Sequence, residues 1–234
     1  MNNNIPAPYA HQSTTTQFII DNPKCLITSD PGTGKTRAVL DALKTIGGKT
    51  LVLAPLSILE AAWVEDITKF TPDLTYGVAY AKNREKIFKQ NSFDIVITNF
   101  EAVKFLSKNK HFLDSFDNLV IDEFTAFKNR TAQRSKSCKL ISSYFERRIA
   151  MSGTPNSNTI LDLWSPVSIV DDGERLGKRF YSFREQVCTP KFNGFANEWI
   201  DKPGIEDTVV NLLKDICIRF ALEDCIDLPD KIIT

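Results

Sequence analysis

The 234-residue sequence has no excess of charge of either sign, because 29 basic residues balance 29 acidic ones. A neutral chain has no overall electrostatic attraction to nucleic acid or to a membrane surface. The sequence also has no apolar run long enough to span a membrane. Its start, MNNNIPAPYAHQ, lacks the basic and apolar regions of a signal peptide. These absences predict a cytoplasmic protein without a membrane partner.

Paired cysteines are also missing. The five cysteines are odd in number, and no two of them have CxxC spacing. This pattern argues against a disulfide framework or a zinc site and favours unpaired, buried thiols in a reducing compartment. Apolar residues make up 42% of the chain, which is enough to bury a substantial core without such cross-links.

Charge is nevertheless concentrated in two stretches. Residues 128–148 contain seven basic residues and one acidic residue, whereas residues 201–230 contain eight acidic and three basic ones. The ordinary interpretation of either stretch is a solvated surface. A functional role is better supported for the basic stretch, because it directly follows an apolar segment that ends in two acids.

A glycine-containing segment, SDPGTGKT at residues 29–36, follows the strand-like run KCLITS. Its pattern predicts a phosphate-binding loop, in which glycines permit a tight turn whose amides point at phosphate oxygens. Lys35 is predicted to contact the β- and γ-phosphates, and the Thr36 hydroxyl to hold Mg²⁺. Ser29 occupies the position of the usual first glycine. The residues predicted to bind the nucleotide here are Pro31, Gly32, Thr33, Gly34, Lys35, Thr36 and Arg37.

A second segment, LVIDE at residues 119–123, is an apolar strand that ends in Asp122 and Glu123. Carboxylates at the end of a buried strand cost desolvation free energy unless a partner compensates, and Mg²⁺ beside Lys35 would be that partner. Asp122 is predicted to organise the metal with Thr36, and Glu123 to activate the attacking water. Lys35, Asp122 and Glu123 are therefore the predicted catalytic residues. A decayed site that does not hydrolyse its nucleotide is the alternative.

Short apolar strands alternate with helical patterns along most of the chain. This alternation predicts βαβ units and an α/β fold, with a mainly parallel sheet covered by helices on both faces. The strands are expected at residues 24–29, 50–54, 74–80, 93–98, 119–121, 148–151 and 218–222. The helices are expected at residues 35–46, 57–70, 83–90, 131–145, 161–170 and 209–216, with a capping box of Ser57 and Glu60 in the second.

Five polar segments each follow a predicted strand: SDPGTGKT, APLS, TNFE, DEFT and SGTP. Ligands of parallel sheets bind at the carboxyl ends of the strands, so these segments are expected at one functional edge. Simpler interpretations exist for single residues. Trp63 is most simply a core residue, Ser57 a helix cap, and Ser152 with Thr154 part of a turn. Gln12 either reads the edge of adenine or lies on a mobile surface segment.

Taken in order, these segments resemble the first RecA-like lobe of a superfamily-two helicase, specifically the Swi/Snf-type DNA translocases. HQ at residues 11–12 is similar to the Q motif, SDPGTGKT to motif I, NLVIDEFTAFKN to motif II, and IAMSGTPNSN to motif III. LVLAPLSILEAAWVEDITKF resembles the Swi/Snf form of motif Ia. DEFT departs from the more usual DE-x-H or DES form.

The resemblance implies a three-layer RecA-like P-loop NTPase fold and an ATP- and Mg²⁺-dependent helicase or translocase. It implies that Gln12 reads adenine and that Ser152 and Thr154 couple the nucleotide to DNA. Duplex DNA, bound without regard to sequence, is the implied partner. The residues implied to lie near its backbone are Pro55, Ser57, Thr98, Lys128 and Asn129. An RNA helicase lobe and a nucleotide-gated binding module without turnover remain alternatives.

The resemblance also divides the chain. Residues 1–22 form an N-terminal segment with the Q-like motif, residues 23–158 the ATP-binding core, and residues 159–228 a helical extension packed on it. Residues 229–234 begin a linker to a second lobe that the sequence does not contain. The second lobe of the family carries arginine fingers, which can contribute ~10³-fold or more to turnover. The chain alone is therefore expected to bind nucleotide but hydrolyse it poorly. A minimal first lobe would suit a phage or bacterial protein.

Overall fold

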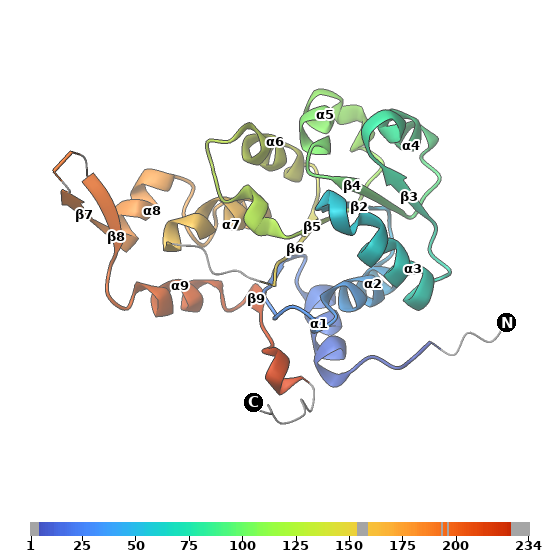
Figure 1. The fold of residues 1–234 in the computed structure, drawn as a ribbon, viewed down its shortest axis with the longest axis horizontal. Coiled ribbons are helices and arrows are strands. Elements are labelled where there is room, and N and C mark those ends of the chain that lie inside the picture. The colour runs from blue at the N-terminus through green and yellow to red at the C-terminus, as the bar shows by residue number, and fades with distance from the viewer. Residues whose placement is uncertain (1–4, 154–158, 193, 196, 226–234) are drawn as a thin grey trace, which may run out of the picture.

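The computed structural model of the chain describes residues 5–153, 159–192, 194–195 and 197–225. Its centre is a seven-stranded sheet in the order β3-β4-β2-β5-β6-β1-β9 (Figure 1). Neighbouring strands of this sheet all run parallel. The strands are β1 Lys24–Ile27, β2 Thr50–Ala54, β3 Tyr76–Ala79, β4 Ile95–Asn99, β5 Asn118–Asp122, β6 Arg147–Met151 and β9 Cys217–Ile218. The predicted α/β class with a mainly parallel sheet is confirmed.

The central strands are apolar throughout because both faces of the sheet are covered. Every residue of β2 and of β5 is buried. Successive residues of a strand point to opposite faces, so Cys25 and Ile27 pack into one core while Leu26 packs into the other. A continuous apolar run is what a parallel sheet between two helical layers requires.

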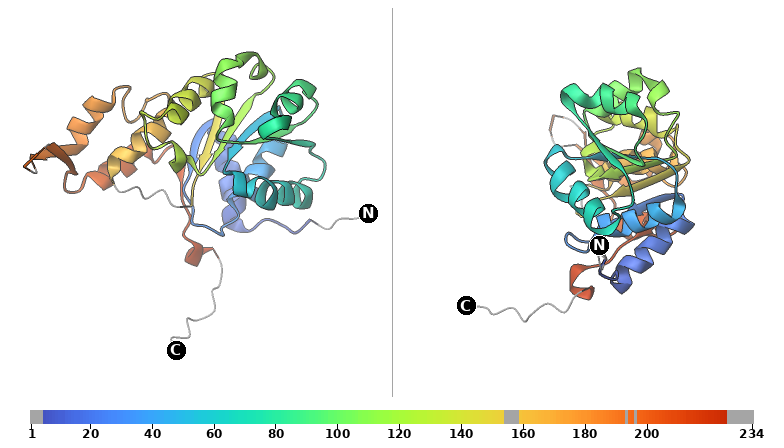
Figure 2. Two further views of the ribbon diagram at one scale, coloured as in Figure 1. Left: turned by 45° about the horizontal axis from the view of Figure 1, so that its top comes forward. Right: turned by 90° about the vertical axis from the view of Figure 1, so that its right-hand side faces the viewer.

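Two layers of helices cover the sheet (Figure 2). The core on one face receives residues of α1, α2 and α3, and the core on the other face receives residues of α4 to α9. The helices are α1 Ala10–Asp21, α2 Lys35–Ile46, α3 Glu65–Phe70, α4 Arg84–Gln90, α5 Ala102–Lys108, α6 Gln133–Ser142, α7 Trp164–Asp171, α8 Phe180–Val187 and α9 Ile205–Leu213. This arrangement confirms the predicted three layers.

The helix predicted at residues 57–70 is instead three consecutive pieces. A 3-10 turn covers Leu56–Ile58, a π-helical turn covers Leu59–Val64, and α3 follows. No side-chain hydrogen bond caps any of them, so the predicted capping box is wrong. Ser57 lies inside the 3-10 turn rather than at a helix start, and Trp63 in the next turn is buried in the core. π-Helical turns are rare and occur frequently at functional sites.

Besides α8, two further helices were not expected from the sequence. In α1, only Thr15 and Ile19 are buried, so the segment has little apolar periodicity to reveal it. The short helix α5 spans Ala102–Lys108 and buries three residues against the sheet. Both helices exist because neighbouring elements cover them, and α1 packs along α2.

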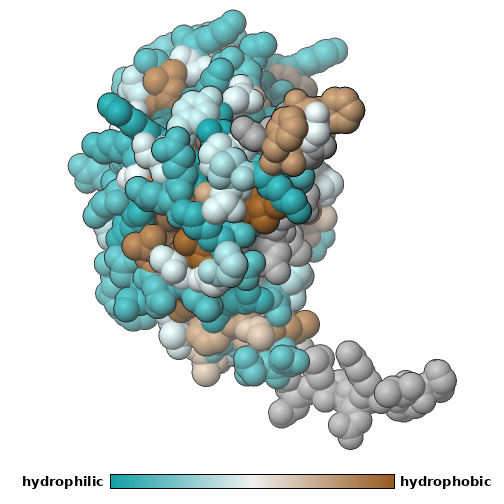
Figure 3. All heavy atoms as spheres, turned by 90° about the vertical axis from the view of Figure 1, so that its left-hand side faces the viewer, coloured by the Kyte–Doolittle hydropathy of each residue, from teal (hydrophilic) through white to brown (hydrophobic). Residues whose placement is uncertain are grey.

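The chain beyond α7 projects from the side of the sheet (Figure 1). It contains α8, an antiparallel hairpin of β7 Cys188–Phe192 and β8 Asn197–Asp201, and α9. It then returns as β9, which pairs with β1 at the edge of the main sheet. The extension therefore supplies a strand to the core sheet as well as helices. Seen from this end, its surface is mostly hydrophilic with scattered apolar side chains (Figure 3).

All five cysteines are free, as predicted, and three of them are buried. Burial raises the pKa of the Cys25 thiol to about 12. The described helices include none that is long and apolar enough to cross a membrane.

Candidate active site

Three loops meet at the carboxyl ends of β1, β6 and β5, which are neighbours in that order. The amide of Ser152, just past β6, donates to Ile27 O at 3.0 Å. Its hydroxyl donates to Glu123 Oε2 at 2.8 Å. A Cβ atom built at Gly153 would lie 3.3 Å from Lys35 Nζ. The glycine loop, the acid pair and the loop after β6 thus form one contiguous site.

The glycine loop leads directly into α2. Gly32 and Gly34 have φ angles of 84° and 76°, in the left-handed region where glycine carries no steric penalty. The Thr33 hydroxyl donates to Asp30 O at 2.9 Å and tightens the turn. Lys35 and Thr36 are the first two residues of α2. The amides of a helix start and its dipole both favour a bound anion, so the loop is suited to phosphate.

The Lys35 ammonium group is folded back onto the loop. Its Nζ atom donates to Ser29 O at 2.9 Å and to Asp30 O at 3.0 Å. Burial lowers the pKa of Lys35, while the carboxylates of Glu123 and Asp122 oppose this shift. A phosphate oxygen bound in the loop would replace the two carbonyl groups as the acceptor for this ammonium group.

Asp122 ends β5 and is only 5% exposed. Its Oδ2 atom accepts a hydrogen bond of 2.9 Å from Nε1 of Trp63, which is itself buried. Burial raises the pKa of Asp122 to about 6, and the Trp63 hydrogen bond opposes this rise. Trp63 is therefore more than the core residue that the sequence suggested, because it orients this carboxylate.

Asp122 makes folding stability depend on pH. Its pKa is about 6 in the folded protein, against an ordinary value of 3.8 for an exposed aspartate. The folded state therefore binds the extra proton, and stability is lost as pH rises from about 4 to 6. We expect D122N to gain roughly 2–3 kcal/mol of unfolding free energy relative to the native chain between pH 4 and pH 8. Urea unfolding without divalent cations at both pH values measures this; an equal difference at the two values would contradict it.

Glu123 has a left-handed backbone, with φ of 55°. It directly precedes a 3-10 turn at Phe124–Phe127. A non-glycine residue in this region costs of order 1 kcal/mol and persists where the surroundings enforce it, often at functional sites. The turn directs the Glu123 carboxylate toward Ser152 and the glycine loop.

The side chains available for a metal here are oxygen donors. They are the Asp122 carboxylate, which also accepts the Trp63 hydrogen bond, and the Thr36 hydroxyl in the first turn of α2. In the described part of the chain, no group of three or more His, Cys, Asp and Glu side chains could hold a metal. Mg²⁺ typically uses one or two carboxylates together with phosphate oxygens and water. This donor set fits Mg²⁺ bound jointly with a nucleotide.

Helix α1 brings two polar side chains to the glycine loop. Gln12 Nε2 donates to Thr33 O at 3.2 Å, and His11 Nε2 lies 2.8 Å from the same oxygen. Gly34 has no side chain where Gln12 passes, and a Cβ atom there would collide with the Gln12 amide. The structure thus places Gln12 beside the glycine loop, on helix α1.

Arg37, which the sequence predicts to bind the nucleotide, has its side chain engaged with other parts of the protein. Its guanidinium group donates to Asp41 Oδ2 at 2.7 Å and to Pro6 O at 3.2 Å. It also lies 4.1 Å from the centre of the Phe70 ring. The Arg37 guanidinium group is therefore occupied by Asp41, Pro6 and Phe70. Only its backbone amide lies in the first turn.

The residues predicted to contact nucleic acid have different surroundings. Ser57, Lys128 and Asn129 are exposed, and Pro55 is partly exposed. Thr98 is 0% exposed, and its hydroxyl donates to Ala79 O within the sheet. The Thr98 side chain is thus used inside the sheet, and its position near the DNA backbone stays a prediction. Thr154, the second predicted coupling residue, lies outside the described residues.

A distant segment also contacts the glycine loop, which the sequence did not indicate. Phe220 N donates to Ser29 Oγ at 3.0 Å, and Leu222 N donates to Asp30 Oδ2 at 3.2 Å. Arg219 approaches the other Asp30 oxygen at 3.4 Å. Residues just past β9 thus hold the start of the loop in place.

Comparison with known proteins identifies the family of this chain. The family described as SNF2-related domain matches residues 11–232. The chain belongs to this family. Among relatives of this SNF2-related domain, a putative protein p41 of Acyrthosiphon pisum secondary endosymbiont phage 1 is 27% identical over 76% of the chain and 42% of its own length. A probable chromatin-remodeling complex ATPase chain of Oryza sativa subsp. japonica is 30% identical over 60% of the chain and 13% of its own length.

Two solved structures share the fold of this SNF2-related domain. The Sulfolobus solfataricus SWI2/SNF2 ATPase core in complex with dsDNA has a TM-score of 0.76 and 24% identity, over 95% of this chain. The SWI2/SNF2 ATPase core domain of the same organism has a TM-score of 0.71 and 25% identity, over 97% of this chain. This chain spans 47% of each solved chain and less than half of the curated relatives named above. This likeness confirms the RecA-like fold, and the family match over residues 11–232 confirms the predicted Swi/Snf-type family.

Proposed function

We propose that this chain is the ATP-binding motor lobe of a DNA-dependent ATPase, a helicase or a double-stranded DNA translocase, which works with a second RecA-like lobe. The ATP-binding core comprises residues 23–158, preceded by the Q-like segment and followed by the extension at 159–228. One observation carries the proposal. Lys35, Glu123 and Ser152 meet at the carboxyl ends of three neighbouring strands, with Asp122 beside them.

The roles follow from the chemistry of each group. Lys35 and the loop amides bind the phosphates, and Asp122 and Thr36 hold Mg²⁺, which would neutralise phosphate charge when bound. Glu123 takes the proton of the attacking water. Ser152, hydrogen-bonded to Glu123, is the residue through which the loop after β6 responds to that event. Gln12, at the rim of the loop, reads the adenine edge.

Duplex DNA is the proposed partner. The relative solved with dsDNA and the chromatin-remodeling relative support this choice. Pro55 and Ser57 on one segment, and Lys128 and Asn129 on another, are the exposed candidates for backbone contacts. Contacts of this kind position a protein on DNA without reading sequence. A phage or bacterial source is in keeping with the similarity to the phage protein.

Two binding measurements on the purified chain test the proposal. Calorimetry should show heat for ATP with Mg²⁺, and fluorescence anisotropy should show duplex DNA binding that weakens steeply with salt and does not depend on sequence. Steady-state hydrolysis should be slow, because the arginine fingers of the family lie in a second lobe. No heat with Mg²⁺ and ATP, or duplex affinity indifferent to salt, would count against the proposal. Rapid DNA-stimulated turnover by the chain alone would refute the expected dependence on a second lobe.

A further inference from the structure

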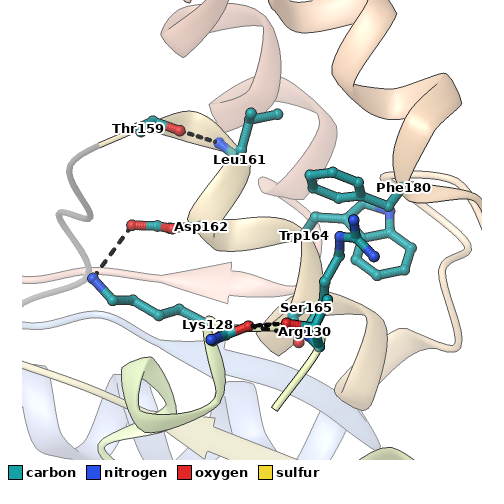
Figure 4. Close-up of a pocket in the computed structure, with 10 residues that line it drawn as sticks. Lys128, Arg130, Thr159, Leu161, Asp162, Trp164, Ser165 and Phe180 are labelled. Carbon is teal, nitrogen blue, oxygen red and sulfur yellow. Dashed lines mark hydrogen bonds and ion pairs between the residues drawn. The ribbon is translucent and has the colours of Figure 1, made fainter. Parts of the chain in front are cut away.

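A pocket of about 490 Å³ lies between the residues that follow the 3-10 turn at Phe124–Phe127 and the start of α7 (Figure 4). Its walls include Lys128, Arg130, Asp162, Trp164 and Phe180. The volume falls within the range of ordinary ligand sites, roughly 300–1,000 Å³. We call this feature the basic pocket.

Two cations reach the basic pocket from the stretch after motif II. Lys128 is exposed, and its Nζ atom lies 3.4 Å from Asp162 Oδ2, an ion pair visible in Figure 4. Its long distance and solvent exposure make it weak. The Lys128 ammonium group can therefore exchange the carboxylate for another anion at little cost.

Arg130 is held by aromatic side chains instead. Its guanidinium carbon lies 4.0 Å from the centre of the Phe180 ring and 5.0 Å from that of Tyr181. Nη2 also donates to the Tyr181 hydroxyl at 3.3 Å. Stacking on aromatic faces restricts the guanidinium group while leaving further N–H donors for an anion. A flat, pre-oriented guanidinium suits a phosphate diester oxygen pair.

The basic pocket is mechanically connected to the acid pair. Glu123 and Lys128 flank the four-residue 3-10 turn at Phe124–Phe127. Both Ser135 and Ser165 donate to Phe127 O, at 3.0 Å and 2.7 Å, and hold the end of that turn. An anion that moves Lys128 therefore acts on a short turn whose other end is the proposed water-activating carboxylate.

From these contacts we propose that the basic pocket binds a phosphate of the duplex DNA backbone, and that Asp162 is a built-in competitor for it. Lys128 exchanges Asp162 for the phosphate, and Arg130 supplies a second, pre-oriented contact. Asp162 thereby weakens DNA binding until a backbone is correctly seated. This inference rests on the proposed function and adds to it a named regulator of affinity.

The test measures binding of a labelled duplex to the full chain by anisotropy at several salt concentrations. D162N should tighten binding about three- to fivefold, the size expected when an exposed ion pair no longer competes. D73N is the matched control: it makes the same charge change and frees Lys44 from an exposed ion pair of 2.9 Å, and neither residue lines the basic pocket. D73N should change duplex affinity less than about 1.5-fold, because salt screens exposed charges that are not close to the bound DNA.

K128Q should weaken binding about fivefold and reduce the slope of log affinity against log salt by about one. In the K128Q background, D162N should no longer tighten binding, because the competition is for Lys128. R130Q should weaken binding more than R130K, which keeps the charge. Thermal unfolding of each variant identifies any that fail to fold. The slope of log affinity against log salt counts phosphate contacts, so a variant that is only less stable should keep the native slope.

The outcomes separate this inference from the proposed function. If D73N raised duplex affinity as much as D162N, or if D162N still raised it in the K128Q background, the proposed role of the basic pocket would be wrong. Binding of Mg²⁺-ATP and of duplex DNA would still support the proposed function. Tighter binding of an RNA duplex of the same length would overturn the choice of DNA. A chain that binds Mg²⁺-ATP but no duplex at any salt concentration would refute both.

Discussion

Replacing Lys35 by alanine should weaken ATP binding about 10- to 100-fold, the size of a lost charge-assisted hydrogen bond to phosphate. Lys35 is the cation that the structure places within the glycine loop and beside Asp122 and Glu123. Without it, triphosphate charge would face two carboxylates with no compensating ammonium group. Titration calorimetry with ATP and Mg²⁺ measures the change.

The control for this variant lies on the same helix. K44A removes an exposed lysine whose partner is Asp73, far from the loop, and should leave ATP affinity unchanged. Lys35 is a half-buried cation, and burial already lowers its pKa. The unfolding free energy of K35A should therefore be lower than that of the native chain by no more than about 1–2 kcal/mol. Native ATP affinity in folded K35A would show that the nucleotide, if bound, lies elsewhere.

Replacing Glu123 by glutamine should slow ATP hydrolysis about 10²- to 10⁴-fold, the usual contribution of a general base. Binding should persist or tighten slightly, because the substitution removes a negative charge next to the phosphates. Glutamine can still accept the Ser152 hydrogen bond through its amide oxygen. Single-turnover assays with enzyme in excess, Mg²⁺ and duplex DNA are sensitive enough for slow hydrolysis.

E174Q provides the comparison, because Glu174 is exposed and its partner is Arg175, away from the site. Its hydrolysis rate should equal that of the native chain. If E123Q and the native chain hydrolysed ATP at the same rate, above the uncatalysed rate, Glu123 would not be the general base. A native chain that binds ATP and never hydrolyses it, even with DNA and a second lobe, would favour the nucleotide-gated binding module.

Much of the candidate site could be predicted because its signals are local. Gly32 and Gly34 are needed for a left-handed turn within a few residues of Lys35, and Asp122 and Glu123 follow directly on their strand. Alternating strands and helices imply a parallel sheet, and such a sheet brings its strand ends to one edge. These inferences require no knowledge of what lies across the molecule.

Other features depend on contacts between distant parts of the chain. Trp63 and Asp122 are 59 residues apart, and the segment at Arg219–Leu222 that contacts the glycine loop is about 190 residues from it. Thr98 and Arg37 were assigned to ligands because of their positions in motifs. In the structure the Thr98 hydroxyl donates to Ala79 O, and the Arg37 guanidinium group donates to Asp41.

The sequence by itself determined the fold class, the glycine loop and the acid pair, because short-range sterics and the periodicity of burial govern them. Tertiary structure alone decided that Trp63 orients Asp122, that Glu123 contacts Ser152, and that Lys128 and Asp162 face one another across a pocket. The physical reason is that side-chain direction at a strand or helix end follows from packing against elements far away in the chain, and no local pattern encodes it.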